Sequence, residues 1–141
     1  MTTTFKEYSE DMDLKRIITG CILLASAVIA GAFGAHALQD LLDTKYQQTY
    51  QTAVTYHFYH AFALVISGIL SSITNSNRLK WAGRSFLTGL ILFSGSLYAL
   101  CLLTAKGYHS FKWLGMITPF GGMCFIIGWL LLASAVSRNK Q

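Results

Sequence analysis

The chain has 141 residues, of which 53% are hydrophobic and 12% charged, about half of the charged share that is usual in soluble domains. Its formal net charge of +5 comes from basic residues that never cluster with interleaved aromatics, which excludes a nucleic-acid interface. Each of four stretches without Asp, Glu, Lys or Arg supplies the roughly 20 residues that cross a bilayer as a helix. These stretches are 17–39, 46–77, 85–105 and 113–137. The composition predicts an all-α integral membrane protein.

Residues 1–16 are expected to form a polar N-terminal tail that precedes the first span, at about 17–38. Lys15 and Arg16 before this apolar run, with an Ala-His-Ala triplet at its end, also resemble a secretory signal peptide with its cleavage site. However, about 20 apolar residues are long for the core of a signal peptide. We therefore expect the segment to stay in place as a membrane span.

Apolar residues at helical spacing in segment 39–53 predict an interfacial amphipathic helix that leads into the second span. Pro119 lies inside the fourth span and predicts a bend there. A C-terminal tail, 137–141, follows. The spans, expected at about 17–38, 54–73, 85–105 and 114–136, form a four-helix bundle over residues 17–136.

Basic residues near the helix ends predict the orientation, since cytoplasmic connectors carry an excess of Lys and Arg. Eight of the 11 lie in the two terminal tails and in the connector between the second and third spans. The other three, Lys45, Lys106 and Lys112, lie in the remaining connectors. Both termini are therefore expected on the cytoplasmic side.

Each span carries a stripe of small or polar residues, and such stripes let membrane helices approach closely. We expect these faces to meet in a common interior. The stripes are Gly20, Ala27, Gly31 and Ala35; Ala53, His57, His60, Leu64, Ser67, Gly68 and Ser71; Ser85, Gly89, Leu92, Ser96 and Ala99; and Gly115, Thr118, Gly122, Phe125 and Gly128. The three cysteines, Cys21, Cys101 and Cys124, lack metal-ligand spacing and are expected to be packing thiols.

Histidines offer the only place for chemistry that the sequence indicates. Counting the rise per residue places His60, Tyr98 and Thr118 at similar depths in the outer half, where they are expected to line a polar pocket with His36 at its rim. His57 and His60 share a helix face, a spacing compatible with a metal, but no carboxylate or cysteine supports one. No metal or cofactor is therefore expected, and a histidine hydrogen-bonded inside the bundle is the simpler interpretation.

Several motifs resemble the YgdD/YwdK-type family of small four-span bacterial inner-membrane proteins, a domain of unknown function. They are GAFGAHAL (31–38), TYHFYHAFAL (55–64), LFSGSLYAL (92–100) and TPFGGMCFIIGW (118–129), which cover all four spans in order. The resemblance implies a four-helix fold and a multi-pass location in the plasma membrane, without an established activity. Its pattern marks His36, Tyr56, His60, Ser94, Ser96, Tyr98, Thr118 and Pro119, and excludes His57 and His109.

The leading hypothesis is a non-enzymatic membrane protein that binds a lipid-like ligand, such as a quinone-like molecule, or a protein partner through its outer-half polar cluster. One alternative is a small transporter or channel component, for which several copies of the chain could assemble into a homo-oligomer. The absence of charged residues from all four spans weakens a proton-coupled transporter. The other alternative is a membrane metal protein or enzyme that uses His36 and His60.

Overall fold

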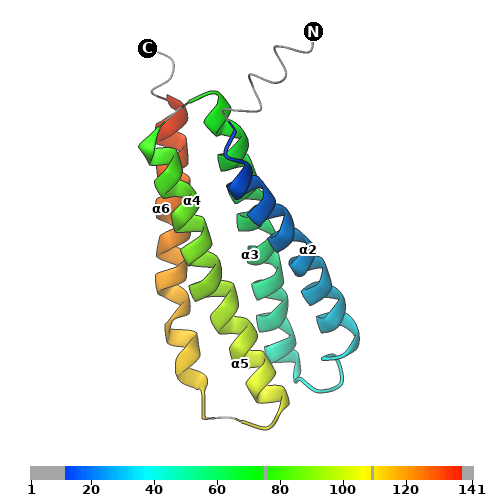
Figure 1. The fold of residues 1–141 in the computed structure, drawn as a ribbon. Helices are drawn as coiled ribbons and strands as arrows, with labels where there is room; N and C mark the ends of the chain where they lie inside the picture. The colour runs from blue at the N-terminus through cyan, green and yellow to red at the C-terminus, as the bar shows by residue number, and fades with distance from the viewer. Residues whose placement is uncertain (1–11, 75, 109, 138–141) are drawn as a thin grey trace.

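A computed structural model describes residues 12–74, 76–108 and 110–137, and all regular structure in these ranges is helical (Figure 1). Four helical stretches there are long and apolar enough to cross a membrane, which confirms the predicted all-α class. The helices are α2 (Leu14–His36), α3 (Thr44–Ile69), α4 (Asn77–Gly89), α5 (Ser96–Ala105) and α6 (Thr118–Ser137). A π-helical segment, η2 (Leu90–Gly95), joins α4 to α5 in one continuous rod, while η1 (Leu70–Ser72) and η3 (Lys112–Met116) are 3₁₀ turns.

Side-chain caps set the starts of three helices. Asp13 Oδ1 accepts a hydrogen bond from Arg16 N at 3.1 Å, and Asp43 Oδ1 accepts one from Tyr46 N at 3.0 Å. Ser76 Oγ accepts from Arg78 N at 3.2 Å. Such caps satisfy backbone donors that a helix leaves unpaired at its first turn.

Two of these starts differ from the predicted ones: α3 begins at Thr44, later than the amphipathic helix expected from 39, and α4 begins at Asn77, earlier than the span expected from 85. The expected amphipathic helix of 39–53 is not separate, because α3 runs without a break from Thr44 through the second span. Likewise α4 begins at Asn77, so most of the predicted polar connector is helical. The bend at Pro119 stays a prediction: the fourth span changes from the 3₁₀ turn η3 to α6 at Ile117, and Pro119 lies in the first turn of α6, where a proline removes no hydrogen bond from the helix.

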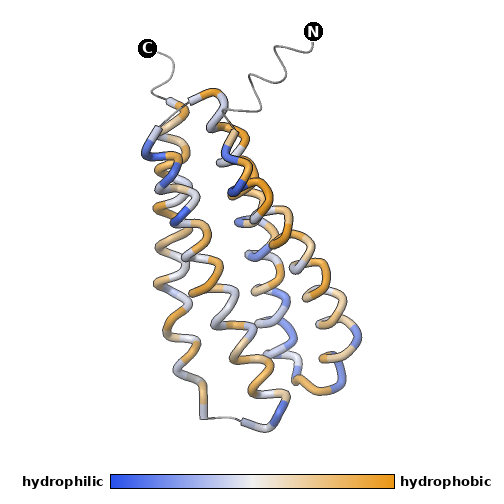
Figure 2. The backbone as a smooth tube through the Cα atoms, viewed as in Figure 1, coloured by the Kyte–Doolittle hydropathy of each residue, from blue (hydrophilic) through white to orange (hydrophobic). Residues whose placement is uncertain are grey.

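The bundle has two distinct ends (Figure 1). The terminal end holds the start of α2, the connection from α3 to α4 and the end of α6, and the opposite end holds the other two connections. Figure 2 shows hydrophobic residues along most of each helix, with hydrophilic ones on α3 as well as near the ends. Accordingly α3 has the lowest mean hydropathy of the four spans and is the most buried.

Helix α2 packs along α3 through glycines that face bulky residues. A Cβ at Gly20 would lie 2.5 Å from Val65 Cγ2, and one at Gly68 would lie 2.7 Å from Ile17 Cγ1. The exchange is reciprocal, since each helix presents one glycine to the other. Lipid tails are as apolar as these side chains, so close backbone approach rather than hydrophobic burial holds the pair together.

Helices α4 and α6 form a second tight pair, in which glycines face phenylalanine rings. A Cβ at Gly89 would lie 2.5 Å from the Phe125 ring, and one at Gly128 would lie 2.6 Å from the Phe86 ring. Gly121 approaches closest to backbone, since its Cβ would lie 2.5 Å from Phe93 N in η2. Phe86 and Phe125 are accordingly buried in the core.

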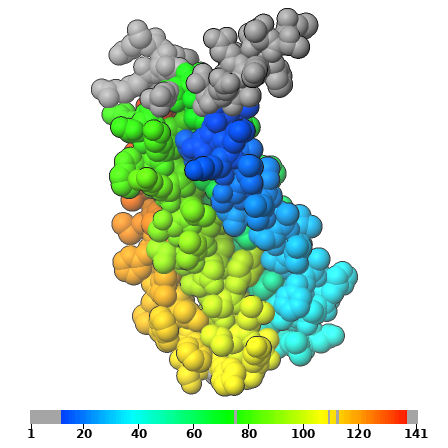
Figure 3. Space-filling view, in the orientation of Figure 1, coloured from blue at the N-terminus to red at the C-terminus, as the bar shows by residue number. Residues whose placement is uncertain are grey.

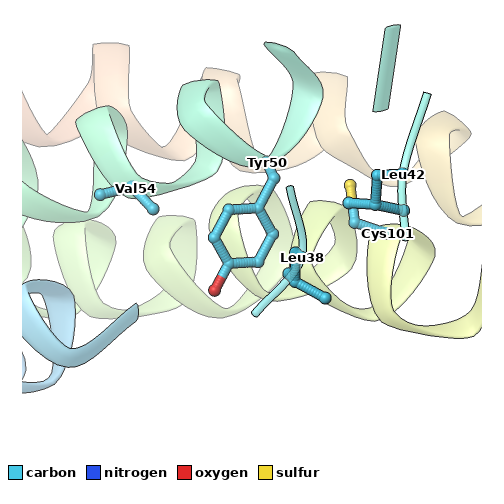
Figure 4. Close-up of a cluster of buried hydrophobic side chains, with 5 residues drawn as sticks. All are labelled: Leu38, Leu42, Tyr50, Val54 and Cys101. Atoms are coloured by element: carbon cyan, nitrogen blue, oxygen red, sulfur yellow. The ribbon is translucent and has the colours of Figure 1, made fainter. Parts of the chain in front are cut away.

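A small core closes the opposite end, where the connection after α2 folds inward (Figure 4). Leu38 and Leu42 pack with Tyr50, Val54 and Cys101. The Tyr50 hydroxyl donates to Ala30 O at 3.0 Å, so this aromatic also ties α3 to α2. In the described chain all three cysteines are free.

Because Gly121 packs against backbone and Gly122 does not, alanine substitutions at these adjacent glycines should have very different effects on stability. Gly121→Ala should lower the unfolding free energy by about 1–3 kcal/mol, because the new methyl group meets backbone that cannot move aside. Gly122→Ala is the matched control, since its Cβ would lie 3.9 Å from the Phe93 ring, and it should be neutral or stabilising. Thermal unfolding in detergent measures both, and equal effects would contradict the packing described for α4 and α6.

Candidate functional site

The structure distributes the eight predicted site residues over four places in the bundle. Tyr56 and His60 lie together in an aromatic cluster, Ser94 and Tyr98 line a cavity, and Ser96 contacts Thr118. Pro119 is exposed beside Thr118, and His36 is exposed at the end of α2. Among the described residues, the side-chain contacts of His60, Tyr98 and Thr118 are with other residues and do not join the three.

His60 has a hydrogen-bond partner at each ring nitrogen. Its Nδ1 lies 2.8 Å from Tyr56 O, and because a carbonyl only accepts, Nδ1 carries the proton. Nε2 is then the acceptor for Trp129 Nε1, at 3.3 Å. The ring stacks on Phe125 with centroids 3.3 Å apart. His60 is thus a buried neutral histidine that joins α3 to α6, and it has no lone pair free for a metal.

Ser96 and Thr118 form a link between the start of α5 and the start of α6. Their hydroxyl oxygens lie 3.2 Å apart, and Ser96 Oγ also donates to Phe93 O at 2.9 Å. Both hydroxyls therefore have partners inside the protein. This arrangement is typical of polar groups that hold membrane helices together.

A cavity of about 150 Å³ lies between α2 and the continuous rod of α4, η2 and α5, and α3 also contributes to its wall. We call it the seam cavity, because it lies between the two tightly packed helix pairs. Its wall is apolar, although three of the residues that line it, from α3, η2 and α5, carry polar groups in their side chains. The lining residues are Leu23, His57, Leu87, Leu90, Ile91, Ser94, Gly95 and Tyr98.

His57, one of the lining residues, has one satisfied and one unsatisfied ring nitrogen. Nδ1 lies 3.3 Å from the Tyr98 hydroxyl, whereas Nε2 is buried without a hydrogen-bond partner among the described residues. If the tyrosine donates, Nε2 carries a proton that nothing accepts; if Nδ1 donates, Nε2 is a lone pair without a donor. Either tautomer leaves one buried polar atom unpaired.

Ser94, another lining residue, has a second unpaired polar atom. The side chain is 2% exposed, and its Oγ has no partner in the described part of the chain. Ser67 and Ser96, by contrast, donate to carbonyls three residues earlier in their own helices. Ser94 lies in η2, and π-helical turns occur frequently at functional sites.

Metal binding has no support from side-chain positions. Across residues 12–74, 76–108 and 110–137, no group of three His, Cys, Asp or Glu residues is placed to hold an ion. His57 and His60 share a face, as expected, but His57 turns to Tyr98 while His60 stacks on Phe125. His109, the fourth histidine, lies outside the described residues.

His57 was not among the eight predicted site residues, because the family pattern does not include it. The sequence pattern around a buried histidine does not show whether both of its ring nitrogens have hydrogen-bond partners. The signal that distinguishes His57 from His60 is the set of neighbours contributed by other helices. Tyr98 meets the first ring and Trp129 the second.

Loss of the indole donor should reveal the structural role of His60. Trp129→Phe keeps the aromatic ring but leaves His60 Nε2 without its donor, and it should lower the unfolding free energy by about 1–2 kcal/mol. Trp113→Phe, at an exposed position in η3, is the control and should have little effect. Thermal melts of the two variants in detergent test this, and an unchanged Trp129→Phe protein would show that the hydrogen bond contributes nothing.

Comparison with known proteins places the chain in a family. Residues 30–122 match the family described as "Protein of unknown function (DUF423)". A "UPF0382 membrane protein" of Staphylococcus epidermidis is 44% identical over 86% of this chain and 94% of its own length. The "UPF0382 membrane protein YwdK" of Bacillus subtilis is 40% identical over 86% of this chain and 95% of its own length.

These relatives confirm the YwdK-type resemblance that the motifs indicated, and no solved structure shows significant similarity to the chain. The relatives are bacterial proteins named as membrane proteins, in agreement with the four helices that can cross a bilayer. The chain is a multi-pass membrane protein and belongs to the DUF423 family.

Proposed function

We propose that this membrane protein is non-enzymatic and binds a small neutral amphiphile, of the quinone-like kind, in the seam cavity. The observation that carries the proposal is that His57 and Ser94, each with a buried polar atom (Nε2 and Oγ) that has no partner among the described residues, line one apolar cavity. A ligand with a carbonyl or hydroxyl group can supply the missing hydrogen bonds. Its apolar body would lie against Leu23, Leu90 and Ile91.

The energetic argument concerns depth in the membrane. His57 lies at the middle of α3, about 20 Å along the helix from Thr44. Water is scarce at that depth, and an unpaired buried polar group costs about 1–3 kcal/mol. Two such groups lower the stability of the ligand-free protein, and a ligand that forms hydrogen bonds with them would restore it.

Size and polarity narrow the class of ligand. A cavity of about 150 Å³ accommodates one ring or a short chain rather than a whole phospholipid. Charged headgroups remain at the bilayer surface, so a ligand whose polar group reaches mid-membrane has to be neutral. Quinones and related isoprenoid molecules combine a neutral polar head with an apolar tail.

The orientation belongs to the same proposal. With the terminal end on the cytoplasmic side, as the bias of Lys and Arg predicts, the seam cavity lies near the middle of the bilayer and opens sideways between α2 and the α4–α5 rod. A ligand would enter from the lipid phase. A tag at either terminus that reacts with impermeant reagents in intact cells would contradict this orientation.

Two serines give a sharp test of the site. Ser94→Ala removes an unpaired hydroxyl, so it should leave the stability of the ligand-free protein unchanged or raise it, while weakening ligand binding roughly five- to tenfold. Ser96→Ala is the matched control: it removes a bonded hydroxyl, so it should lower stability and leave binding unchanged. The probe is decylubiquinone, titrated calorimetrically into purified protein in detergent, with partition into empty micelles subtracted.

A blocking variant completes the test. Gly95 lines the seam cavity and a Cβ there would meet only Leu90 O, at 3.7 Å, so Gly95→Leu should fill the cavity without disturbing the helix. Gly115→Leu places the same side chain in η3, where a Cβ meets nothing within 4 Å. Binding lost in the first variant and kept in the second supports the site. Equal binding in both, or no quinone binding by the wild type, would overturn the proposal.

A further inference from the structure

A second cavity, of about 280 Å³, lies at the terminal end of the same seam, and its wall is strongly basic. It lies between the first turns of α2 and residues 80–87 of α4, and Leu64 of α3 also lines it. Figure 3 shows this face of the molecule, with α2 in blue beside α4 in green. The lining residues are Asp13, Lys15, Arg16, Thr19, Leu64, Lys80, Gly83, Arg84 and Leu87. We call this the basic cavity.

Arg16 is a fixed part of the wall. Its Nε donates to Asp13 Oδ2 at 2.7 Å, and its Nη1 donates to Ser67 O at 3.0 Å and Leu79 O at 3.2 Å. Gly83 makes this possible, because a Cβ there would lie 2.8 Å from Arg16 Cδ. The guanidinium therefore joins α2 to both α3 and α4 and holds the cavity open at a defined width.

Asp13 does not neutralise the rest of the cavity. Partial burial raises the pKa of Asp13, but the side-chain and backbone hydrogen bonds from Arg16 outweigh it, so the pKa lies below its usual value. The carboxylate is thus ionised at neutral pH and balances Arg16. Lys15, Lys80 and Arg84 are exposed, and none forms an ion pair within the described part of the chain. Among the described residues, these three positive charges around the cavity have no acidic partner.

The position of this cavity indicates which anion it suits. Trp81 lies beside it, 57% exposed, with the Arg84 guanidinium 4.9 Å from its ring centroid. Exposed tryptophans next to basic residues mark the level of lipid headgroups. Below the charges the wall turns apolar: Leu87 lines both the basic cavity and the seam cavity, and Ile18 and Ile22 expose apolar surface on α2.

We propose that the basic cavity binds the phosphate group of an anionic phospholipid, with Lys15, Lys80 and Arg84 as its cationic partners and the acyl chains along the apolar surface below. Basic pockets between transmembrane helices bind such headgroups in other membrane proteins. A soluble phosphate has the same charge, but it would gain nothing from the apolar surface that continues beneath the cations. The site is independent of the proposed quinone-like ligand and shares only Leu87 with the seam cavity.

Charge-neutralising variants test the site. The wild type should bind phosphatidylglycerol at least about tenfold more tightly than phosphatidylcholine, and Lys80→Gln/Arg84→Gln should remove most of that preference. Lys45→Gln/Lys106→Gln is the matched control, with the same change in net charge at the opposite end. Arg78→Gln, at the terminal end but outside the cavity lining, is a second control. Lipid retention by detergent-purified protein, measured by native mass spectrometry, gives the occupancies.

The outcomes separate site binding from general attraction. Loss confined to the cavity variant, with recovery in the charge-conserving Lys80→Arg/Arg84→Lys protein and normal thermal melting throughout, supports the proposal. An equal loss in the control variants, or no preference for phosphatidylglycerol, overturns it. Displacement of the bound lipid by millimolar inorganic phosphate at constant ionic strength would assign the cavity to a soluble anion instead. Unchanged decylubiquinone binding in the cavity variant keeps this result distinct from the test of the seam cavity.

Discussion

Close contact between glycine and a bulky side chain on the facing helix is the constraint from which the rest of this structure follows. Inside a bilayer, burial of apolar side chains gives little net gain, so helices associate where their backbones approach. The glycines divide the bundle into two pairs, because Gly20 and Gly68 join α2 to α3 while Gly89 and Gly128 join α4 to α6. Between α2 and the α4–α5 rod the packing is looser, and both proposed sites lie there.

The two sites along this seam differ in the depth and charge of their walls. At the terminal end, cations surround a cavity at the level of the lipid headgroups, and this chemistry suits a phosphate. Deeper, the wall is apolar, two of its lining residues each hold a buried unpaired polar atom, and this chemistry suits a neutral molecule. Arg16 joins α2 to α3 and α4 at one end, and Tyr50 joins α3 to α2 at the other, so α2 is held at both ends of the seam.

Much of the fold was predictable from the sequence, because an uncharged run of about 20 residues has few alternatives to a membrane helix. The buried face of α3 followed from small-residue periodicity, with His60 and Gly68 buried as expected. The face of α6 followed only in part: Phe125 and Gly128 are buried, but Gly121 is buried in place of Gly122. The third helix follows the predicted stripe only in part: Gly89 and Ser96 are buried as predicted, but Ser94, Leu97 and Cys101 are buried outside the stripe, and its other members are only partly buried. The π-helical turn explains this shift, since each residue in it turns through a smaller angle than in an α-helix.

The candidate site was less predictable, because its properties depend on which side chains from other helices meet each polar group. Sequence spacing placed His57 and His60 on one face, yet only the neighbours of each ring show that one is satisfied and the other is not. An experimental structure in lipid nanodiscs is the most direct test of that difference. If the seam cavity binds a ligand, we expect elongated density there, within hydrogen-bond distance of His57 Nε2 or Ser94 Oγ. A closed seam, with those two atoms bonded to protein groups, would contradict it.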